Sequence, residues 1–327
     1  MIEPGAPAGK RPAATVVFGE VLVNDFVTGQ LAGGAPFNVA RNLAAFMAPQ
    51  LFITRIGCDH NGAVVRAEFE RFALSERGLQ VDRMEETGRV LVERHRGDHR
   101  IVILPRQAYD VIDPQQALAA LATVTPTAIY FGTLAQRGQR SHDTLYRLLG
   151  AGGASGADGV ISATRFLDIN LRDGQAGRGC VTESLQAADI VKLNEEELQA
   201  LFSWFFHIDP ATSLDSDAVR AACRALRDMF SLEALIVTLG HRGSVYFGAD
   251  DALIVNCDNP APPFVIDTAG AGDAFAAIFL LGRARGWPLE LTLARANEFA
   301  GALCAVNGAV PQDIGFYDKW VGRWRAG

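Results

Sequence analysis

Apolar positions along the chain follow two alternating patterns. Short continuous apolar runs, rich in β-branched residues, stand between stretches whose apolar residues recur at helical spacing. The runs predict strands at residues 15–23, 51–57, 127–134, 165–171, 189–194, 234–240 and 264–268. The helical patterns include residues 37–47, 63–78 and 273–286. Continuous apolar strands separated by helices predict an α/β fold with a mainly parallel, doubly wound sheet covered by helices on both faces, in three αβα layers.

One region departs from this pattern. Residues 88–105 (GRVLVERHRGDHRIVILP) alternate between apolar and polar positions around a charged turn, which predicts an antiparallel hairpin with one solvent-exposed face. With a further strand after the first apolar run, it predicts a small β-flap, or lid, built from about 23–34 and 86–106. Residues 1–14 are rich in Pro, Gly and Ala and predict a disordered leader. The remaining residues, 15–327, are predicted to form one domain.

Charge and composition exclude several classes of partner. The 30 basic residues are outnumbered by 37 acidic ones, for a net charge of −7, which argues against a nucleic-acid binder and against a polybasic membrane anchor. The most apolar stretch, 274–282, is too short to span a bilayer. The 5 cysteines are scattered without a CxxC pair, as expected of reduced thiols. We therefore expect a soluble, cytoplasmic protein that binds neither nucleic acid nor membrane.

The polar residues that follow the predicted strands are the first candidates for a site, because ligands of open α/β sheets bind beyond the carboxyl ends of the strands. In FVIDTAGAGDAF (264–275), Gly270, Ala271, Gly272 and Asp273 stand where a helix begins. Free N–H groups at a helix start attract anions, and glycines let an anion approach closely. The segment is neither a Walker A loop nor a GxGxxG fingerprint. The alternative is that Asp273 only stabilises the helix start.

Two more segments combine a helix start with polar side chains. In AGGAPFNVARNLA (32–44), Gly33 and Gly34 allow close approach of a ligand, and the amide of Asn38 can exchange hydrogen bonds with hydroxyls. The alternative is a simple turn before a helix. In LNEEEL (193–198), Asn194 and Glu197 share a helix face and offer the oxygen ligands that suit Mg²⁺ with its waters. The alternative is a capped helix with an acidic first turn.

Two strand ends complete the set. Strand periodicity in LDINLRDG (167–174) places Asp168, Asn170 and Arg172 on one face, with Arg172 near the end of the strand, where it can meet an anionic oxygen. VTLGHRGSVYF (237–247) is a strand followed by a glycine-flanked turn that would border a nucleotide, through Thr238, Gly240 and Gly243.

In this order and at these spacings, the segments resemble the PfkB/ribokinase family of sugar kinases. GGAPFNVARNLA is similar to the family's N-terminal Gly-Gly signature and DTAGAGDAFAA to its C-terminal signature. NEEE is similar to the Asn-x-x-Glu motif, VTLGHRG to the Thr-x-Gly-x-x-Gly turn, and IGCDHNG (56–62) to a Gly-x-Asp-x-x-Gly stretch. The resemblance runs from about residue 15 to 311 and implies a ribokinase-like fold.

The resemblance implies a role for each motif residue. Asp273 would be the general base, and Gly270, Ala271 and Gly272 would form an anion hole for the transferred phosphoryl group. The remaining roles are sugar binding by Asn24, Gly33, Gly34, Asn38 and Arg172; ATP binding by Asn194, Thr238, Gly240, Gly243 and Asn307; Mg²⁺ held through water by Asn194 and Glu197; and a monovalent cation such as K⁺ at Asp267.

One position departs from the family pattern. The sugar-binding Asp at the end of the first strand falls, by spacing from Gly19, on Asn24, with Asp25 beside it. Adjacent strand residues face opposite sides, so both cannot reach the sugar without a bulge. Ala269 also stands in place of the usual Thr.

These implications converge on an ATP-dependent kinase for a primary hydroxyl of a small sugar. GEVLVND, GGAPFN, YFGTLAQR and DINLR are most similar to fructokinase-type members, which favours fructose and its 6-hydroxyl. Ribokinase, 2-keto-3-deoxygluconate kinase and nucleoside kinase activities remain alternatives, as does a catalytically inactive sugar- or nucleotide-binding regulator. A nicotinamide dehydrogenase is disfavoured by the missing GxGxxG. The lid leaves strand edges and an apolar face to cover, and a homodimer through the lid would cover them.

Overall fold

The computed structural model describes residues 11–26, 29–95, 98–153, 163–172, 174–206, 217–249, 253–256 and 264–325. Its main sheet has nine strands, of which seven neighbouring strands run parallel, while each of the two strands at one edge pairs antiparallel with its inner neighbour. In spatial order these are β13 (Leu253–Asn256), β12 (Ser244–Phe247), β11 (Ala234–Thr238), β10 (Ile190–Asn194), β9 (Thr164–Asp168), β8 (Thr125–Phe131), β1 (Ala13–Phe18), β4 (Gln50–Gly57) and β5 (Leu79–Asp82). The predicted doubly wound α/β fold is confirmed.

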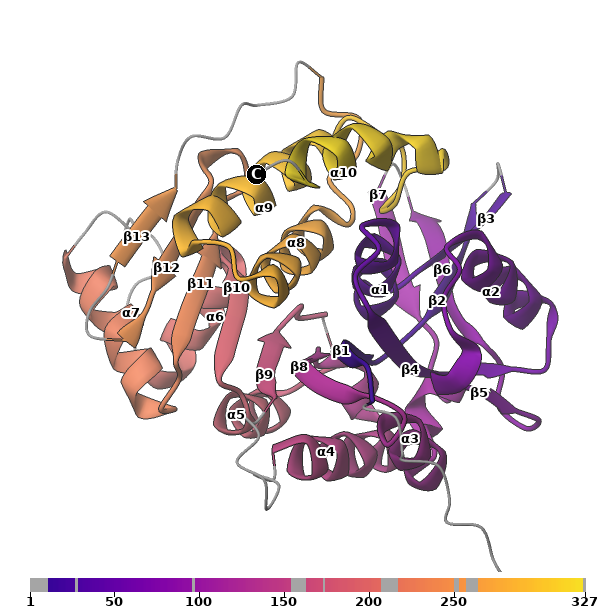
Figure 1. Ribbon diagram of the computed structural model, residues 1–327. Coiled ribbons are helices and arrows are strands. Elements are labelled where there is room, and N and C mark those ends of the chain that lie inside the picture. Colours follow the sequence, from indigo (N-terminus) through magenta and orange to yellow (C-terminus); the bar gives the residue numbers. More distant parts are fainter. Residues whose placement is uncertain are drawn as a thin grey trace, which may run out of the picture.

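Helices cover both faces of this sheet (Figure 1). One face carries α1 (Ala35–Ala45), α2 (His60–Arg71), α8 (Ala271–Arg285), α9 (Leu289–Leu303) and α10 (Asp318–Arg325). The other carries α3 (Pro114–Leu121), α4 (Gln139–Gly153), α5 (Arg178–Ala187), α6 (Glu195–Phe205) and α7 (Asp217–Met229). Short 3₁₀ turns connect them: η1 (Glu76–Gly78), η2 (Ala108–Val111), η3 (Leu134–Arg137), η4 (Gly240–Arg242) and η6 (Ile314–Tyr317).

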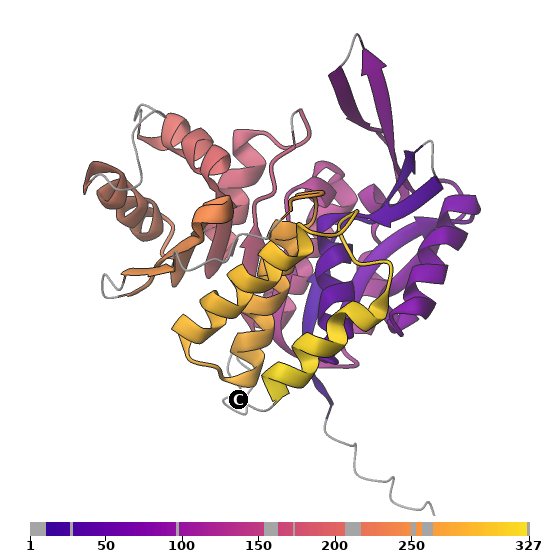
Figure 2. The ribbon, with the colours of Figure 1, turned by 90° about the horizontal axis from the view of Figure 1, so that it is seen from above.

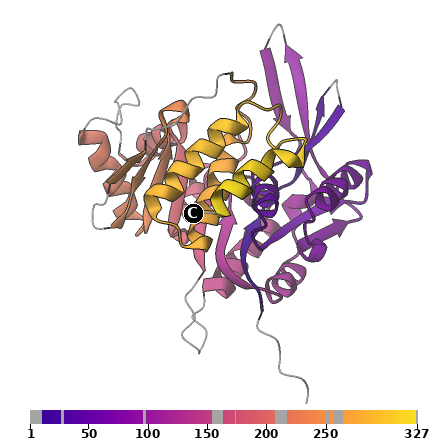
Figure 3. The same cartoon turned by 45° about the horizontal axis from the view of Figure 1, so that its top comes forward.

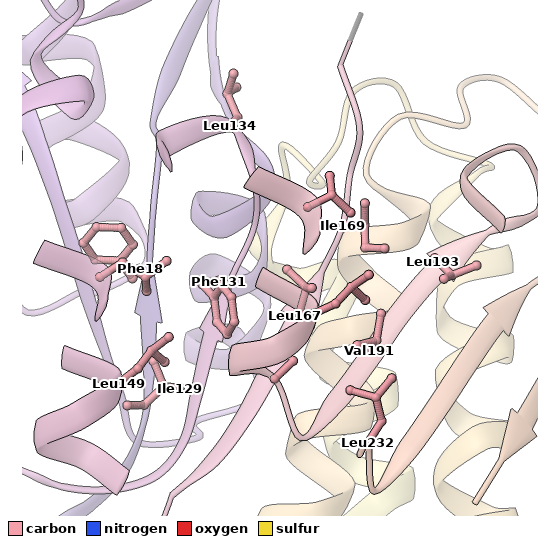
Figure 4. Close-up of a cluster of buried hydrophobic side chains, with 14 of the residues drawn as sticks. Phe18, Ile129, Phe131, Leu134, Leu149, Leu167, Ile169, Val191, Leu193 and Leu232 are labelled. Carbon is pink, nitrogen blue, oxygen red and sulfur yellow. The ribbon is translucent and has the colours of Figure 1, made fainter. Parts of the chain in front are cut away.

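Each face of the sheet has its own hydrophobic core because successive strand side chains point to opposite sides. In β1, Val16 and Phe18 face the α3–α7 side, whereas Val17 faces α1 and α8. Figure 4 shows the first of these cores, where side chains of β1, β8, β9 and β10 pack together. Burial on both sides explains why these strands read as continuous apolar runs.

A second, four-stranded sheet stands apart from the main one. Its order is β3 (Gly29–Gly33), β2 (Leu22–Phe26), β6 (Gly88–His95) and β7 (Asp98–Ile103), with only the β2–β6 pair parallel. The β6–β7 hairpin projects away from the body (Figures 2 and 3). We call this sheet the lid; its strands overlap the predicted segments 23–34 and 86–106, and β2 begins one residue earlier, at Leu22.

Several predicted elements differ from the observed ones. The strand predicted at 15–23 is two strands, because Gly19 adopts φ +151° and the chain turns from β1 into the lid. The helix predicted at 63–78 ends at Arg71 and is followed by η1. β1 begins at Ala13, within the predicted leader, whose residues 1–10 lie outside the described part.

The strand predicted at 264–268 was wrong. Phe264, Val265 and Ile266 are exposed in a loop, and both Ile266 and Asp267 donate their backbone N–H to the Cys304 carbonyl (2.8 and 3.3 Å). This segment is therefore attached to the end of α9. Among the described helices, none is long and apolar enough to cross a membrane.

Candidate active site

The start of α8 has the geometry of an anion site. Gly270 caps the helix in the left-handed region (φ +78°), and a Cβ at this position would collide with the Ala309 carbonyl. The N–H groups of a helix's first turn have no carbonyl partner inside the helix. That of Ala271 makes a long bond to the Thr268 carbonyl (3.3 Å), so those of Gly272 and Asp273 are the ones best placed to receive an anion.

Asp273 meets Asn38 from the other end of the sequence. Asn38 lies in the first turn of α1, after Gly34 (φ +110°), and its backbone N–H donates to the Gly34 carbonyl (2.9 Å). Helices α1 and α8 pack side by side (Figure 1). Nδ2 of Asn38 consequently donates a 2.6 Å hydrogen bond to Oδ2 of Asp273. Two separately predicted site residues thus form one unit.

The surroundings of Asp273 make it a stronger proton acceptor than an ordinary aspartate. Burial raises the pKa of its carboxyl, and the negative charge of Asp168 raises it further. The hydrogen bond from Asn38 and the positive charges of Lys192 and Arg172 act in the opposite direction, but the net shift is upward. A carboxylate with a raised pKa suits a general base.

Lys192 is a member of this site that sequence reasoning missed. Its ammonium lies 2.8 and 2.9 Å from the two carboxylate oxygens of Asp168, which also accepts from the Tyr130 hydroxyl (3.1 Å). A Cβ on Gly272 would stand 3.2 Å from Nζ, so the ammonium lies against the helix start. Burial acts to lower the pKa of Lys192, but the charges of Asp168 and Glu197 outweigh it and raise the pKa. The sequence signal was a lysine inside a buried apolar strand.

The strand face predicted for Asp168, Asn170 and Arg172 is not continuous. β9 ends at Asp168, and Asn170 has a positive φ of 46°, which breaks the alternation. Asp168 is buried as the partner of Lys192. Arg172 is exposed, and its charge lowers the pKa of both Asp273 and Glu20, so it lies within electrostatic range of these two carboxyls.

Glu20 is the second residue that sequence reasoning missed. It follows Gly19, where the chain leaves β1 for the lid, and it is 2% exposed. Its Oε2 finds no hydrogen-bond partner among the described residues. Burial raises its pKa to about 7, an effect that its own backbone N–H and the charge of Arg172 reduce. The sequence signal was a glutamate within the apolar run 15–23.

Two of the predicted sugar-binding positions, Asn24 and Gly33, lie in the lid. Asn24 in β2 pairs with Leu31 of β3, and its Nδ2 lies 3.3 Å from where a Cβ of Gly33 would stand. Asn24 and Gly33 are therefore neighbours across the lid. Gly34 is needed for packing, since a Cβ there would lie 2.8 Å from the Glu20 carbonyl. The side chain of Asp25 lies outside the described part.

Asn194 and Glu197 form the capped helix start that was the alternative reading of their motif. Asn194 caps α6 by accepting from the Glu197 N–H (2.8 Å), while Oε2 of Glu197 accepts from the Asn194 N–H (2.8 Å). Oε1 of Glu197 accepts from the Leu171 N–H (2.8 Å). Among the described residues no group of three or more acidic, His or Cys side chains could hold a metal. Backbone N–H groups thus occupy both oxygens of Glu197, and a Mg²⁺ held by this pair through water stays a prediction.

The predicted nucleotide positions gather at the neighbouring strand ends. Thr238 stands beside Asn194 in the register of β10 and β11. The turn after β11 contains Gly240 (φ +59°) and Gly243 (φ +91°).

The predicted cation and adenine positions adjoin each other. Asp267 accepts from the Ala269 N–H (2.9 Å) and the Gly308 N–H (3.1 Å), so its loop joins the turn in which Asn307 is exposed. Both carboxylate oxygens of Asp267 thus accept hydrogen bonds from loop backbone, and a cation bound there would share these oxygens with the N–H groups.

Comparison with known proteins finds relatives over most of the chain. The family described as pfkB family carbohydrate kinase matches residues 13–313. The fructokinase of Klebsiella pneumoniae is 28% identical over 281 residues, which cover 82% of this chain and 83% of that protein. The fructokinase of Xylella fastidiosa with bound ATP superimposes with a TM-score of 0.77 at 19% identity, over 96% of this chain and 99% of the other.

A fructokinase double mutant from Vibrio cholerae, bound to fructose, ADP and potassium, superimposes with a TM-score of 0.71 at 20% identity, over 92% of this chain and 95% of the other. At such identities the structural likeness establishes the fold, while the family match extends over nearly the whole sequence. The chain belongs to the pfkB family of carbohydrate kinases.

Proposed function

We propose that the protein transfers the γ-phosphoryl group of ATP to a primary hydroxyl of a small sugar, with the 6-hydroxyl of fructose as the preferred acceptor. The observation that carries the proposal is the Asn38–Asp273 pair at the start of α8, with Lys192 against the same helix turn. The fructokinases among the relatives support fructose.

On the acceptor side, Asp273 would take the proton of the attacking hydroxyl. Asn38 already occupies Oδ2, which leaves Oδ1 to face the substrate. Asn24 and Gly33 in the lid, together with Gly34, Asn38 and Arg172, would hold the remaining sugar hydroxyls. As the proton moves to Oδ1, the sugar oxygen forms its bond to the γ-phosphorus and the bond to the bridging β–γ oxygen breaks.

On the phosphoryl side, fixed positive groups would stabilise the charge that develops during transfer. The N–H groups of Gly272 and Asp273, helped by Gly270 and Ala271, would bind the equatorial oxygens, with the Lys192 ammonium close behind Gly272. Donors that are held in place need no reorganisation as charge develops.

The nucleotide would lie along Asn194, Thr238, Gly240 and Gly243 at neighbouring strand ends, with Asn307 near the adenine. Asn194 and Glu197 would hold Mg²⁺ through water, and the ion when bound would neutralise phosphate charge. Asp267 and nearby carbonyls would hold K⁺, a cation named with one of the superimposed fructokinases.

A substrate panel tests the proposal. ADP release is measured with Mg-ATP and K⁺ and with fructose, ribose, 2-keto-3-deoxygluconate or adenosine as acceptor. We expect fructose to show the highest kcat/KM. The matched control is Asp273→Asn, which keeps the shape of the side chain and should lower kcat by about 10²–10⁴-fold. Near-normal turnover by this variant would rule out Asp273 as the base, and no response to any acceptor would favour an inactive sugar- or nucleotide-binding protein.

A further inference from the structure

Arg41 is a buried arginine in α1, one turn beyond Asn38, and only 3% of it is exposed. Its guanidinium stacks on the ring of Phe37 at 4.3 Å. Nη2 donates to Oδ1 of Asn38 at 2.6 Å and to the Ala32 carbonyl of lid strand β3 at 2.9 Å. Nη1 forms an ion pair with Glu68 of α2 at 2.6 Å. Burying a charged side chain is costly unless it is paired, and an apolar side chain at this position would avoid that cost. A buried arginine here therefore suggests a specific role.

The chemistry of arginine determines which way the Asn38 amide points. A guanidinium has only donors, so the Asn38 atom that faces Arg41 must be the amide oxygen. The NH₂ group is then turned toward Asp273, where it donates at 2.6 Å. If the amide were reversed, its oxygen would face the carboxyl of Asp273 and would favour the protonated acid, which cannot serve as a base.

We propose that Arg41 is a positioning residue for the phosphoryl-transfer reaction, holding the Asn38 amide so that its NH₂ keeps Asp273 ionised. Arg41 touches neither the reacting atoms nor Asp273 and acts through Asn38. Its second bond, to Ala32, attaches the same guanidinium to the lid strand that contains Gly33. The orientation of the base is thereby tied to the position of the lid. This inference rests on the proposed function, in which Asp273 is the base.

The test compares two variants that each break the buried Arg41–Glu68 ion pair. Arg41→Met removes the donor to Asn38. Glu68→Gln removes the ion pair but leaves Arg41 in place, and Glu68 touches neither Asn38 nor Asp273 in the described hydrogen bonds. We expect R41M to lower kcat about tenfold or more and to move the acid limb of the pH profile of kcat/KM upward by about one pH unit. E68Q should keep the wild-type profile although its Tm falls.

Two further variants make the result decisive. Because R41M leaves the Glu68 carboxylate without this partner, the double variant R41M/E68L removes both charges together and should show the same shifted limb. Arg41→Lys retains a donor-only group and should restore the limb toward its wild-type position. A wild-type pH profile in both R41M and R41M/E68L would overturn the proposal and leave Arg41 with a structural role only.

The carboxyl pKa of Asp273 can also be measured without turnover. In ¹³C NMR titration, the Asp273 signal is assigned by its loss in Asp273→Asn. A higher pKa in R41M than in E68Q supports the inference even if no panel sugar is phosphorylated, whereas equal pKa values refute it. Failure of the proposed function and failure of this inference are therefore distinguishable.

Discussion

Glu20 is a buried carboxyl whose charge state links the stability of the protein to pH. Its pKa is raised from 4.5 to about 7 by burial, so between these values the folded protein binds a proton that the unfolded chain has released. The stability contributed by this proton is fully present below about pH 4.5 and is lost as pH rises through about 7. The loss is on the order of 3 kcal/mol, because each pKa unit corresponds to about 1.4 kcal/mol.

Glu20→Gln should therefore flatten the pH dependence of stability. The neutral amide has nearly the same shape and does not titrate, so the drop in unfolding free energy between pH 5 and pH 8 should be smaller in the variant than in the wild type. Urea denaturation of both proteins at the two pH values measures the difference. Equal drops would show that Glu20 titrates normally.

A substitution at Asn24 tests the proposed sugar-binding site. This residue stands where the family pattern has Asp, and it lies against Gly33 in the lid. Asn24→Asp introduces a charged acceptor for sugar hydroxyls, which makes stronger hydrogen bonds than a neutral amide. We expect the KM for the sugar to change severalfold while the KM for ATP stays within about twofold. Equal changes in both KM values would remove Asn24 from the sugar site.

Helix α8 places the proposed base and anion site together, and a glycine at each end allows a matched comparison. Gly270 (φ +78°) and Gly286 (φ +67°) both adopt left-handed conformations. A Cβ on Gly270 would strike the Ala309 backbone, whereas a Cβ on Gly286 would meet nothing within 4 Å.

Gly286→Ala should therefore cost only the left-handed penalty of about 1 kcal/mol, with kcat unchanged. Gly270→Ala should cost more, about 2–4 kcal/mol, because backbone must move. It should also lower kcat, since the displaced helix start carries Gly272 and Asp273. Thermal melts and steady-state kinetics on both variants make the comparison; similar Tm and kcat values would show that the helix start tolerates displacement.

At the scale of elements, apolar periodicity was enough to predict most strands of the sheet, because strands buried on both faces leave continuous apolar runs. It failed at 264–268, where apolar residues lie exposed in a loop attached to α9. It also failed at 15–23, because a positive φ at Gly19 redirects the chain without changing the apolar pattern. Apolar periodicity predicts burial. It misleads at 264–268, where apolar residues are exposed, and at 15–23, where the residues are buried but the chain changes direction.

The site was only partly predictable from the sequence, because several of its contacts form only when distant segments of the chain meet in the fold. Motif residues such as Asp273 and Asn38 stand at recognisable helix starts, so sequence could nominate each one. Lys192 and Glu20 meet the other site residues only in the folded chain, which no local pattern encodes. Arg41 reaches Asn38 one helical turn away, but its other partners, Ala32 and Glu68, come from other segments. Asn194 and Glu197 show a further limit, since their spacing fits both a capped helix and a metal site.

The last helix holds together the face of the molecule that carries the proposed base. Trp324 of α10 is 3% exposed and stacks on Phe46, the residue after α1, with ring centroids 5.2 Å apart. It also meets Trp287, which follows α8, at 5.8 Å. One indole therefore joins α10 to the ends of the two helices that contribute Asn38 and Asp273.

Trp324→Ala should remove about 3–5 kcal/mol of unfolding free energy, because it empties a large buried aromatic site. Trp324→Phe keeps a ring against Phe46 and should cost clearly less. Because the indole lies at the far ends of α1 and α8, the folded fraction of either variant should retain near-normal kcat in its phosphotransferase assay. Denaturant titration gives the first quantity and active-site-normalised kinetics the second. A kcat that falls with the loss of stability would mean that packing around α10 also controls the orientation of Asn38 toward Asp273.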